Sequence, residues 1–304
     1  MGIGAGARKN KAAQARFIGL KPNINLNTMV IGIDVGISTT KIVGIENNKV
    51  IAPTRIKATD PVTSLYGGFG KFLYENKVSL ADVEQVMLTG VGAGCISENI
   101  YGIPTNHVDE FVADAIGAQY GSGLDKMIVT SMGTGTTLVH VDNGEVHHLG
   151  GLGIGGGTLA GLAKTMLGTT DIAHMLRLAE NGDQAKVNLV IGDISDKPLP
   201  GLPMDATASL FGNIKSDAEP CDIALGIIWL VLQTIGSATY LASLKTGIRN
   251  YVMIGNVTKI PQARQIFDSI EPLYGVKYII PEHSDYCTAI GAALNYYNTG
   301  FKFV

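Results

Sequence analysis

Hydrophobic and polar positions alternate along this chain in two different patterns, which predict two kinds of element. From residue 29 onward, runs rich in β-branched residues predict strands at 29–36 and 40–58, the latter folded back at an "ENN" turn. Longer stretches with helical spacing predict helices at 61–77 and 107–123, on either side of a strand at 83–90. The chain therefore alternates strands with helices, as α/β proteins do.

The opening pattern returns in the middle of the chain. Residues 125–151 again predict a strand, a Gly/Thr turn, a second strand, a hairpin at Asn143-Gly144 and a third strand. The sequence therefore contains a weak internal duplication, in which each half begins with a strand, a tight turn and a strand.

The longest apolar stretch, residues 222–244, predicts a helix buried in the core. It is interrupted by Gln233, Thr234, Ser237 and Thr239, whereas a spanning helix needs about 18 or more residues with few polar breaks. We expect no membrane segment.

Composition and charge narrow the class of protein. With 304 residues and 46% hydrophobic content, the chain can bury a substantial core. Lys and Arg number 23 against 26 Asp and Glu, so no basic excess points to nucleic acid or to an anionic membrane. The cysteines, at 95, 221 and 287, stand far apart, which argues against a zinc ribbon or a disulfide framework and favours reduced thiols in a cytoplasm.

The first 28 residues differ from the rest. They contain five basic residues and no acid, and Met29 directly precedes the first strand. We interpret 1–28 as an extension outside the fold, and the alternative is an ordered basic arm that contacts a partner subunit or an anionic ligand.

Two turns carry candidate chemistry. In the first, "DVGISTTK" (34–41), a carboxylate interrupts an apolar run, which is costly unless the group has a partner or a function. The second is "SMGTGTTL" (131–138). If the two hairpins face each other across a cleft, their glycine amides, hydroxyls and Lys41 can bind a polyphosphate, and Asp34 can hold Mg²⁺ directly or through water. The candidate phosphate-binding residues are Gly36, Ser38, Thr39, Thr40 and Lys41 in the first turn and Gly133, Thr134, Gly135 and Thr136 in the second.

A third element is the glycine-rich entry to a helix at 150–167. Gly155, Gly156 and Gly157 stand directly before the helical pattern. Because the amides at a helix N-terminus lack partners and carry the positive end of the dipole, we expect them to face a nucleotide. The spacing is not that of a P-loop.

At this point the residues carry a family resemblance. The segments "DVGISTTKIVGI", "LTGVGAGCISENI", "VDEFVADA", "SMGTGTTL", "GGLGIGGGTLAGL", "MIGNVTKIPQARQIF" and "CTAIGAAL" follow one another as in the type II pantothenate kinases, a branch of the acetate and sugar kinase and actin superfamily. The resemblance covers residues 30 to about 297. It implies an α/β fold of actin-like (ribonuclease H-like) type, with two lobes, a duplicated mixed β-sheet and flanking helices.

The resemblance also implies an activity. Members of this family phosphorylate pantothenate to 4'-phosphopantothenate with ATP and Mg²⁺, the first step of coenzyme A biosynthesis, and we expect a cytoplasmic homodimer. Coenzyme A or acyl-CoA becomes a candidate further ligand. The implied lobes are residues 29–124 and 125–304, the second with the dimerisation helices.

Carried over by position, the family's catalytic glutamate falls on Glu110, near the start of the predicted helix. A carboxylate beside the substrate hydroxyl can accept its proton during phosphoryl transfer. From spacing alone, an acid there is equally explained by the helix dipole. Asp109 is the neighbour that could be confused with it, and Asp114 shares its helical face. The resemblance further places Gly255, in "IGN" (254–256), near the adenosine.

Two positions depart from the family pattern. The acid that usually follows the glutamate by two residues is replaced by Val112. The family's substrate-binding arginine falls on His148, a weaker and pH-dependent partner for a carboxylate, beside Gly151 in the same candidate subsite.

Three alternatives remain open from sequence. A kinase of the same superfamily for another small hydroxyl substrate would keep both phosphate turns. The ATPase activators of acyl-CoA dehydratases share a similar start but need cysteines that bridge an iron-sulfur cluster, and the helix with Glu110 has none. A non-catalytic sensor of ATP or acyl-CoA would keep the glycines and could lose the base.

Overall fold

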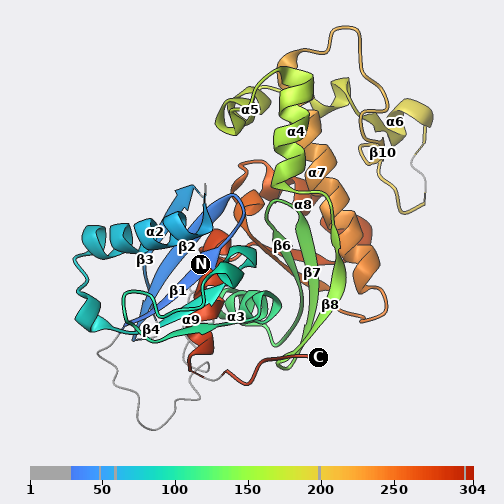
Figure 1. The fold of residues 1–304 in the computed structure, drawn as a ribbon. Helices are drawn as coiled ribbons and strands as arrows, with labels where there is room; N and C mark the ends of the chain where they lie inside the picture. The colour runs from blue at the N-terminus through green and yellow to red at the C-terminus, as the bar shows by residue number, and fades with distance from the viewer. Residues whose placement is uncertain (1–28, 48, 58–59, 198–199, 298) are drawn as a thin grey trace, which may run out of the picture.

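The computed structural model describes residues 29–47, 49–57, 60–197, 200–297 and 299–304. Within them the chain forms two large mixed β-sheets with flanking helices, which confirms the predicted α/β class (Figure 1). The expected extension, residues 1–28, lies outside the described residues.

The first sheet contains β1 (Met29–Val35), β2 (Thr39–Glu46), β3 (Lys49–Lys57), β4 (Val83–Thr89) and β5 (Thr105–His107), in the order β3-β2-β1-β4-β5. Strands β1, β2 and β3 form an antiparallel meander, and β4 and β5 run parallel to β1. Strand β1 is buried along its whole length because helices cover both faces. Ile31 and Ile33 pack with α2 (Pro61–Asn76), whereas Val30, on the opposite face, packs with α3 (Glu110–Ser122) and α9 (Cys287–Asn295).

The second sheet repeats this pairing scheme. Its strands are β6 (Lys126–Met132), β7 (Thr136–Asp142), β8 (Glu145–Leu152), β11 (Asn250–Ile254), β12 (Lys277–Ile279) and β13 (Lys302–Phe303), in the order β12-β11-β6-β7-β8-β13. Strands β6, β7 and β8 form the antiparallel meander, and β11 and β12 run parallel to β6. The duplication predicted from the sequence is therefore present in the tertiary structure.

The helices of the second lobe gather around α7 (Pro220–Ser243), which contacts α4 (Gly156–Leu167), α5 (Ile172–Ala179) and α8 (Ala263–Tyr274). Among the described helices, α7 alone is long and apolar enough to cross a membrane, yet 61% of its apolar window is buried inside the protein. Its Trp229 and the aliphatic residues around it belong to a hydrophobic core cluster. Two short elements, α6 (Ile191–Ile194) and the β9–β10 ladder (Leu189–Val190 and Thr207–Ser209), lie beyond α4 at the top of Figure 1.

Helix α9 connects the end of the chain to the first lobe. It follows the second sheet in sequence but packs against β1, β2, β4 and, most extensively, α3. The approach of α3 and α9 requires glycine on both helices. A Cβ atom at Gly117 would lie 1.9 Å from the carbonyl oxygen of Cys287, and one at Gly291 would lie 1.8 Å from that of Ala113. Helix α9 thus packs on the first sheet although it follows the second sheet in the chain, and the division into residues 29–124 and 125–304 stays a prediction.

We expect Gly117→Ala to lower the free energy of unfolding by about 3 kcal/mol, because its methyl group must push two backbones apart in a packed interior. Gly67→Ala is the matched control, since Gly67 lies in α2 and a methyl group there would meet nothing within 4 Å. It should raise stability by about 0.5–1 kcal/mol, the ordinary gain from removing a helix-interior glycine. Urea unfolding of both variants tests this, and equal effects would contradict the close packing of α3 and α9.

Candidate active site

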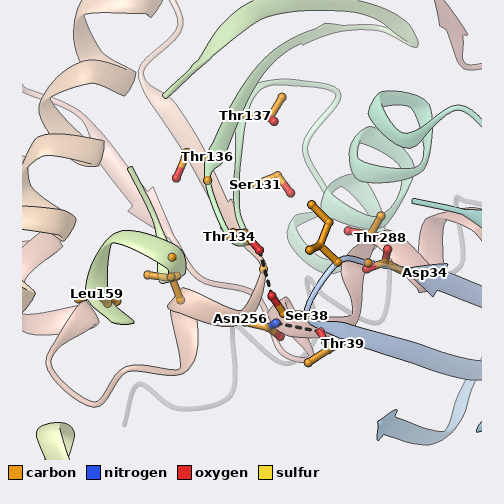
Figure 2. A pocket seen from close by; sticks show the side chains of 18 of the residues that line it. Asp34, Ser38, Thr39, Ser131, Thr134, Thr136, Thr137, Leu159, Asn256 and Thr288 are labelled. Carbon is orange, nitrogen blue, oxygen red and sulfur yellow. Dashed lines mark hydrogen bonds between the residues drawn. The ribbon is translucent and has the colours of Figure 1, made fainter. Parts of the chain in front are cut away.

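A cavity of about 690 Å³ lies between the two lobes and collects most of the residues singled out from the sequence. Fourteen of the predicted residues line it, drawn from both lobes (Figure 2). They are Asp34, Gly36, Ser38, Thr39, Lys41, Glu110, Gly133, Thr134, Gly135, Thr136, Gly151, Gly156, Gly157 and Gly255. Three predicted residues, Thr40, His148 and Gly155, are not among its lining residues.

The structure of the first turn shows how the buried carboxylate of Asp34 is compensated. Asp34 and Lys41 face each other across the β1–β2 ladder, and Lys41 Nζ lies 3.2 Å from Asp34 Oδ2. Both side chains are buried, so each charge compensates the desolvation of the other. The amide of Gly36 donates to the carbonyl of Thr39 (3.1 Å) and closes the turn.

The alternation of side chains along β2 explains why Thr40 does not face the cavity. Thr39 and Lys41 point to the same side as Asp34, whereas Thr40 pairs with Val35 and points toward the opposite face, where it is fully buried. The structure therefore does not support the prediction that the Thr40 side chain binds phosphate. Successive side chains of a strand point to opposite faces, so Thr40 faces away from the cavity that Thr39 and Lys41 line.

Gly90, at the end of β4, allows the chain to pass close to Asp34. It has a φ of +89°, and a Cβ atom there would lie 2.6 Å from Asp34 Oδ1. Both the left-handed backbone and the lack of space require glycine. The backbone that follows β4 therefore lies directly against the Asp34 carboxylate and forms part of the cavity wall.

The second turn and the start of α4 form one hydrogen-bonded unit. The amides of Gly156 and Gly157 donate to the carbonyls of Gly133 (2.8 Å) and Thr134 (2.9 Å). The amide of Gly155 donates to the Thr158 hydroxyl at 3.1 Å. The expectation that these three amides are free for an anion is therefore wrong, because those of Gly156 and Gly157 hold the second turn against α4 and that of Gly155 is used within the first turn of α4. Gly156 and Gly157 line the cavity, and Gly155 is not among its lining residues.

The two turns meet across the cavity. The hydroxyls of Ser38 and Thr134 are hydrogen-bonded at 3.1 Å (Figure 2). This arrangement of two hairpins facing each other is the one predicted from the duplicated sequence, and it places hydroxyls and backbone from both lobes at one point.

The start of α3 separates the roles of its two acids. Asp109 is the N-cap residue, and its Oδ1 accepts from the amides of Phe111 (2.9 Å) and Val112 (3.1 Å). Glu110 instead lines the cavity. Burial, and next the charge of Asp34, raise the pKa of Glu110 above its ordinary value. Of the two neighbouring acids, Glu110 is thus the one that can contact a molecule bound in the cavity.

His148 lies on β8, outside the cavity lining. Its ring stacks on Phe111, with centroids 4.5 Å apart and an angle of 9° between the planes. The prediction that His148 replaces the family's substrate-binding arginine is not supported in this arrangement, because its ring packs against a helix and not into the cavity.

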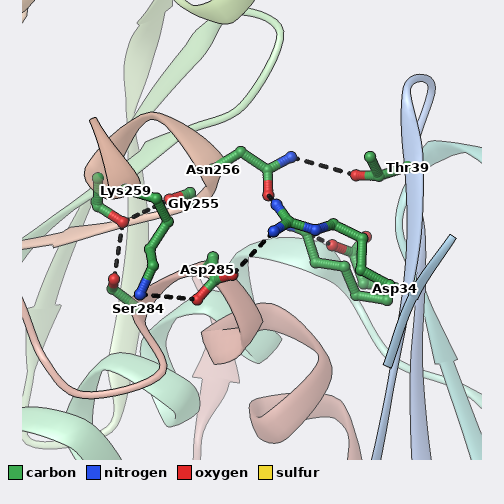
Figure 3. A network of polar contacts seen from close by, with 10 residues as sticks. Asp34, Thr39, Gly255, Asn256, Lys259, Ser284 and Asp285 are labelled. Carbon is green, nitrogen blue, oxygen red and sulfur yellow. Dashed lines mark hydrogen bonds and ion pairs between the residues drawn. The ribbon is translucent and has the colours of Figure 1, made fainter. Parts of the chain in front are cut away.

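A polar network joins the lobes beside the first turn (Figure 3). Arg55 Nη1 donates to Asn256 Oδ1 at 3.3 Å, and Asn256 Nδ2 donates to the Thr39 hydroxyl at 3.2 Å. Arg55 and Lys259 both pair with Asp285, at 3.9 and 3.7 Å. Asn256 thereby connects β2 of the first lobe with the turn that follows β11 in the second.

Sequence reasoning assigned no role to several lining residues. Ser131, Thr137, Lys259 and Thr288 add polar groups, and an apolar wall is formed by Leu159, Ala160, Ile172, Leu176, Val257 and Ile260. Ser131 and Thr137 flank the second turn, so their positions could have been inferred from it. Thr288 and the apolar wall come from α9, α4, α5 and the turn after β11, and only the tertiary fold brings these segments together.

We expect Glu110→Gln and Asp109→Ala to change stability in opposite directions. A carboxyl whose pKa is raised by folding destabilises the protein increasingly from about pH 4.5 upward, so Glu110→Gln should unfold at a higher temperature than wild type at pH 8 and at the same temperature near pH 4. Asp109→Ala removes an N-cap and should cost about 1 kcal/mol at pH 8. Thermal unfolding at both pH values measures these effects. If the effect of Glu110→Gln did not depend on pH, the raised pKa of Glu110 would be contradicted.

Comparisons with known proteins agree with this geometry. A family model described as Fumble matches residues 30–295. The type II pantothenate kinase of Staphylococcus epidermidis (strain ATCC 35984) is 29% identical over 277 residues, which are 87% of this chain and 99% of that protein. The type II pantothenate kinase of Staphylococcus aureus (strain NCTC 8325) is 28% identical over 275 residues, 87% of this chain and 98% of that protein.

Among solved structures, the activator of the 2-hydroxyisocaproyl-CoA dehydratase from Clostridium difficile, with bound ADPNP, superposes with a TM-score of 0.65. It is 18% identical and the match covers 90% of this chain and 96% of that one, so the likeness is one of fold. It confirms the predicted actin-like architecture, and the curated relatives confirm the resemblance to type II pantothenate kinases. This chain belongs to the Fumble family.

Proposed function

We propose that this protein is a pantothenate kinase, which transfers the γ-phosphoryl group of ATP to the primary hydroxyl of pantothenate and forms 4'-phosphopantothenate for coenzyme A synthesis. The observation that carries the proposal is the placement of Glu110 in the same cavity as the two facing turns. The names of the Staphylococcus relatives support the choice of substrate.

In this proposal Glu110 accepts the proton of the attacking hydroxyl. A general base works best when its pKa lies near the operating pH, and partial burial beside Asp34 moves the pKa of Glu110 in that direction. Asp109 does not compete for the role, because both of its bonds to amides serve the helix.

The two turns bind the phosphates of ATP. A phosphate group bound at the two turns replaces the hydrogen bond between Ser38 and Thr134 by bonds from these hydroxyls to its own oxygens, so both lobes supply donors to it. Lys41, held by Asp34, supplies the positive charge. The apolar wall from α4, α5 and the turn after β11 suits the base and ribose of the nucleotide.

Mg²⁺ belongs to the proposal, with Asp34 as its protein carboxylate. Mg²⁺ is usually held by one or two carboxylates together with phosphate oxygens and water, and the cavity offers Asp34 for this. No cluster of three or more His, Cys, Asp or Glu side chains suited to a metal occurs in the described part of the chain, which fits an ion that arrives with the nucleotide. When bound, the ion neutralises charge on the transferred phosphoryl group.

The dimer, the cytoplasmic location and binding of coenzyme A or acyl-CoA also remain proposals. The dimer is supported by Leu241 and Leu244, which are 63% and 50% exposed at the end of α7. Light scattering would measure the mass in solution, and a monomer would contradict the dimer.

We expect Glu110→Gln to lower kcat for pantothenate by about 10²- to 10⁴-fold, the usual contribution of a general base. The assay follows ATP consumption and 4'-phosphopantothenate formation. Asp109→Asn is the matched control, since an Asn keeps the helix cap and should leave kcat within about twofold. Full activity of Glu110→Gln would remove Glu110 from the mechanism, and turnover on another alcohol alone would refute pantothenate as substrate.

We expect Asp34→Asn to raise the Mg²⁺ concentration for half-maximal activity by about tenfold or more, because an amide is a neutral and weaker ligand than a carboxylate. Asp60→Asn is the control, since Asp60 caps α2 through the amide of Thr63 and is not a lining residue of the cavity. An unchanged Mg²⁺ requirement in Asp34→Asn would exclude Asp34 as the carboxylate that holds the ion.

A further inference from the structure

A second carboxyl lies directly behind the wall that carries Glu110. Asp114 stands one helical turn later on α3 and is only 1% exposed. The Thr288 hydroxyl donates to Asp114 Oδ1 at 2.6 Å. Thr288 lines the cavity, whereas Asp114 is not among its lining residues. Asp114 therefore contacts the site through the Thr288 hydroxyl, which belongs to it.

The packing of α3 on α9 gives Asp114 no freedom to move away. Ala113, its neighbour, lies against Gly291, and Gly117 lies against Cys287, the residue before Thr288. Asp114 and Thr288 are thus held between two backbone contacts, one on either side along the helices. A carboxyl in this position cannot turn toward solvent to relieve the cost of burial.

The titratable groups around Asp114 are mostly acidic. Burial, and next the charges of Glu110 on the same helix and Asp34 on β1, raise the pKa of Asp114 to about 7, whereas the hydrogen bond from Thr288 lowers it. On α9, the buried Cys287 thiol has a pKa raised by burial and by the charge of Asp114.

Two further groups lie near this set, and the charge of Lys41 offsets it in part, since it lowers the pKa of Glu110. Lys41 on β2 is already paired with Asp34. His148 on β8 stacks on the Phe111 ring of α3. Because Glu110 and Asp114 share one face of the helix, ionising one opposes ionisation of the other, and Asp114 is the more deeply buried of the two.

We propose that Asp114 is a positioning residue that acts in its neutral, protonated form: it orients the Thr288 hydroxyl and leaves Glu110 as the charged base. The inference rests on the proposed kinase function. When Asp114 ionises, a further negative charge stands behind the place where the phosphates of ATP bind, and ATP binding weakens. The two carboxyls thus take separate roles because the fold gives them different exposure.

The test compares Asp114→Asn with Asp114→Ala between pH 5.5 and 9. An asparagine offers Thr288 the same carbonyl acceptor and replaces the acid O–H by an N–H donor, so it imitates the neutral acid permanently. We expect kcat/KM for ATP in wild type to fall about tenfold above pH 7. This is the effect expected if ATP binding and the ionisation of Asp114 oppose each other by about one pK unit. Asp114→Asn should keep its activity at pH 6 within about threefold and lose this decline. Asp114→Ala should lose about tenfold or more at every pH, because the Thr288 hydroxyl loses its partner.

A binding measurement separates this proposal from the kinase proposal. Calorimetric titration with a non-hydrolysable ATP analogue and saturating Mg²⁺ needs no acceptor substrate, so it tests Asp114 even if pantothenate is not phosphorylated. Affinity should weaken above pH 7 in wild type and in the surface control Asp109→Asn, and stay constant in Asp114→Asn. Superposed pH profiles of wild type and Asp114→Asn in this titration would overturn the proposal, as would an Asp114→Asn variant as inactive at pH 6 as Asp114→Ala.

Thermal unfolding verifies that the Asn variant is folded and tests the burial of the acid. A buried carboxyl with a raised pKa lowers stability progressively from about pH 4 to about pH 7. Asp114→Asn should therefore unfold at a higher temperature than wild type at pH 8. A lower unfolding temperature at that pH would show that Asp114 is stabilised as an anion, which contradicts the neutral form.

Discussion

The close contact of α3 with α9 is the constraint on which the site depends. Gly117 and Gly291 let the two helix backbones come so close that a methyl group at either position would collide with the backbone of the other helix. This contact joins the end of the chain to the first lobe, and it fixes Glu110 on one helix and Thr288 on the other as walls of one cavity. Any side chain at either glycine would separate them. The position of Glu110 therefore depends on backbone packing at Gly117 and Gly291, further along the two helices.

A second constraint is the pairing of charges at the first turn. Asp34 and Lys41 are buried together, so neither is an isolated ion in the interior. The same pair sets the electrostatics of the surrounding carboxyls, since Asp34 raises the pKa of Glu110 and contributes to that of Asp114. Asp34 therefore has two effects, because the charge that the fold must compensate is also the one that raises the pKa of Glu110.

The lobes are held together over the cavity by contacts between polar side chains. The hydroxyl pair of Ser38 and Thr134 and the amide of Asn256 bridge the two sheets. Bridges of this kind are weaker than a buried apolar interface and exchange readily with ligand atoms or water. The cavity can therefore admit a nucleotide by exchanging these polar contacts, without disturbing the buried apolar clusters of the lobes.

Local pattern in the sequence was sufficient for the elements and for the duplicated hairpins, because strand alternation, turn residues and helix spacing are properties of neighbouring residues. It also placed Asp34, Lys41 and the two turns correctly in one cavity, and the resemblance brought Glu110 to it. It failed where a contact between distant segments decides the outcome. The amides of Gly156 and Gly157 are used by the second turn, the side chain of Thr40 points to the opposite face of β2, and His148 stacks on Phe111. Asp114 was noted only as a neighbour of Glu110, since its burial depends on α9, which arrives more than 170 residues later. The sequence by itself determined which groups are available; the tertiary structure decided which way they face and what they touch, because burial and charge coupling arise only when remote segments pack.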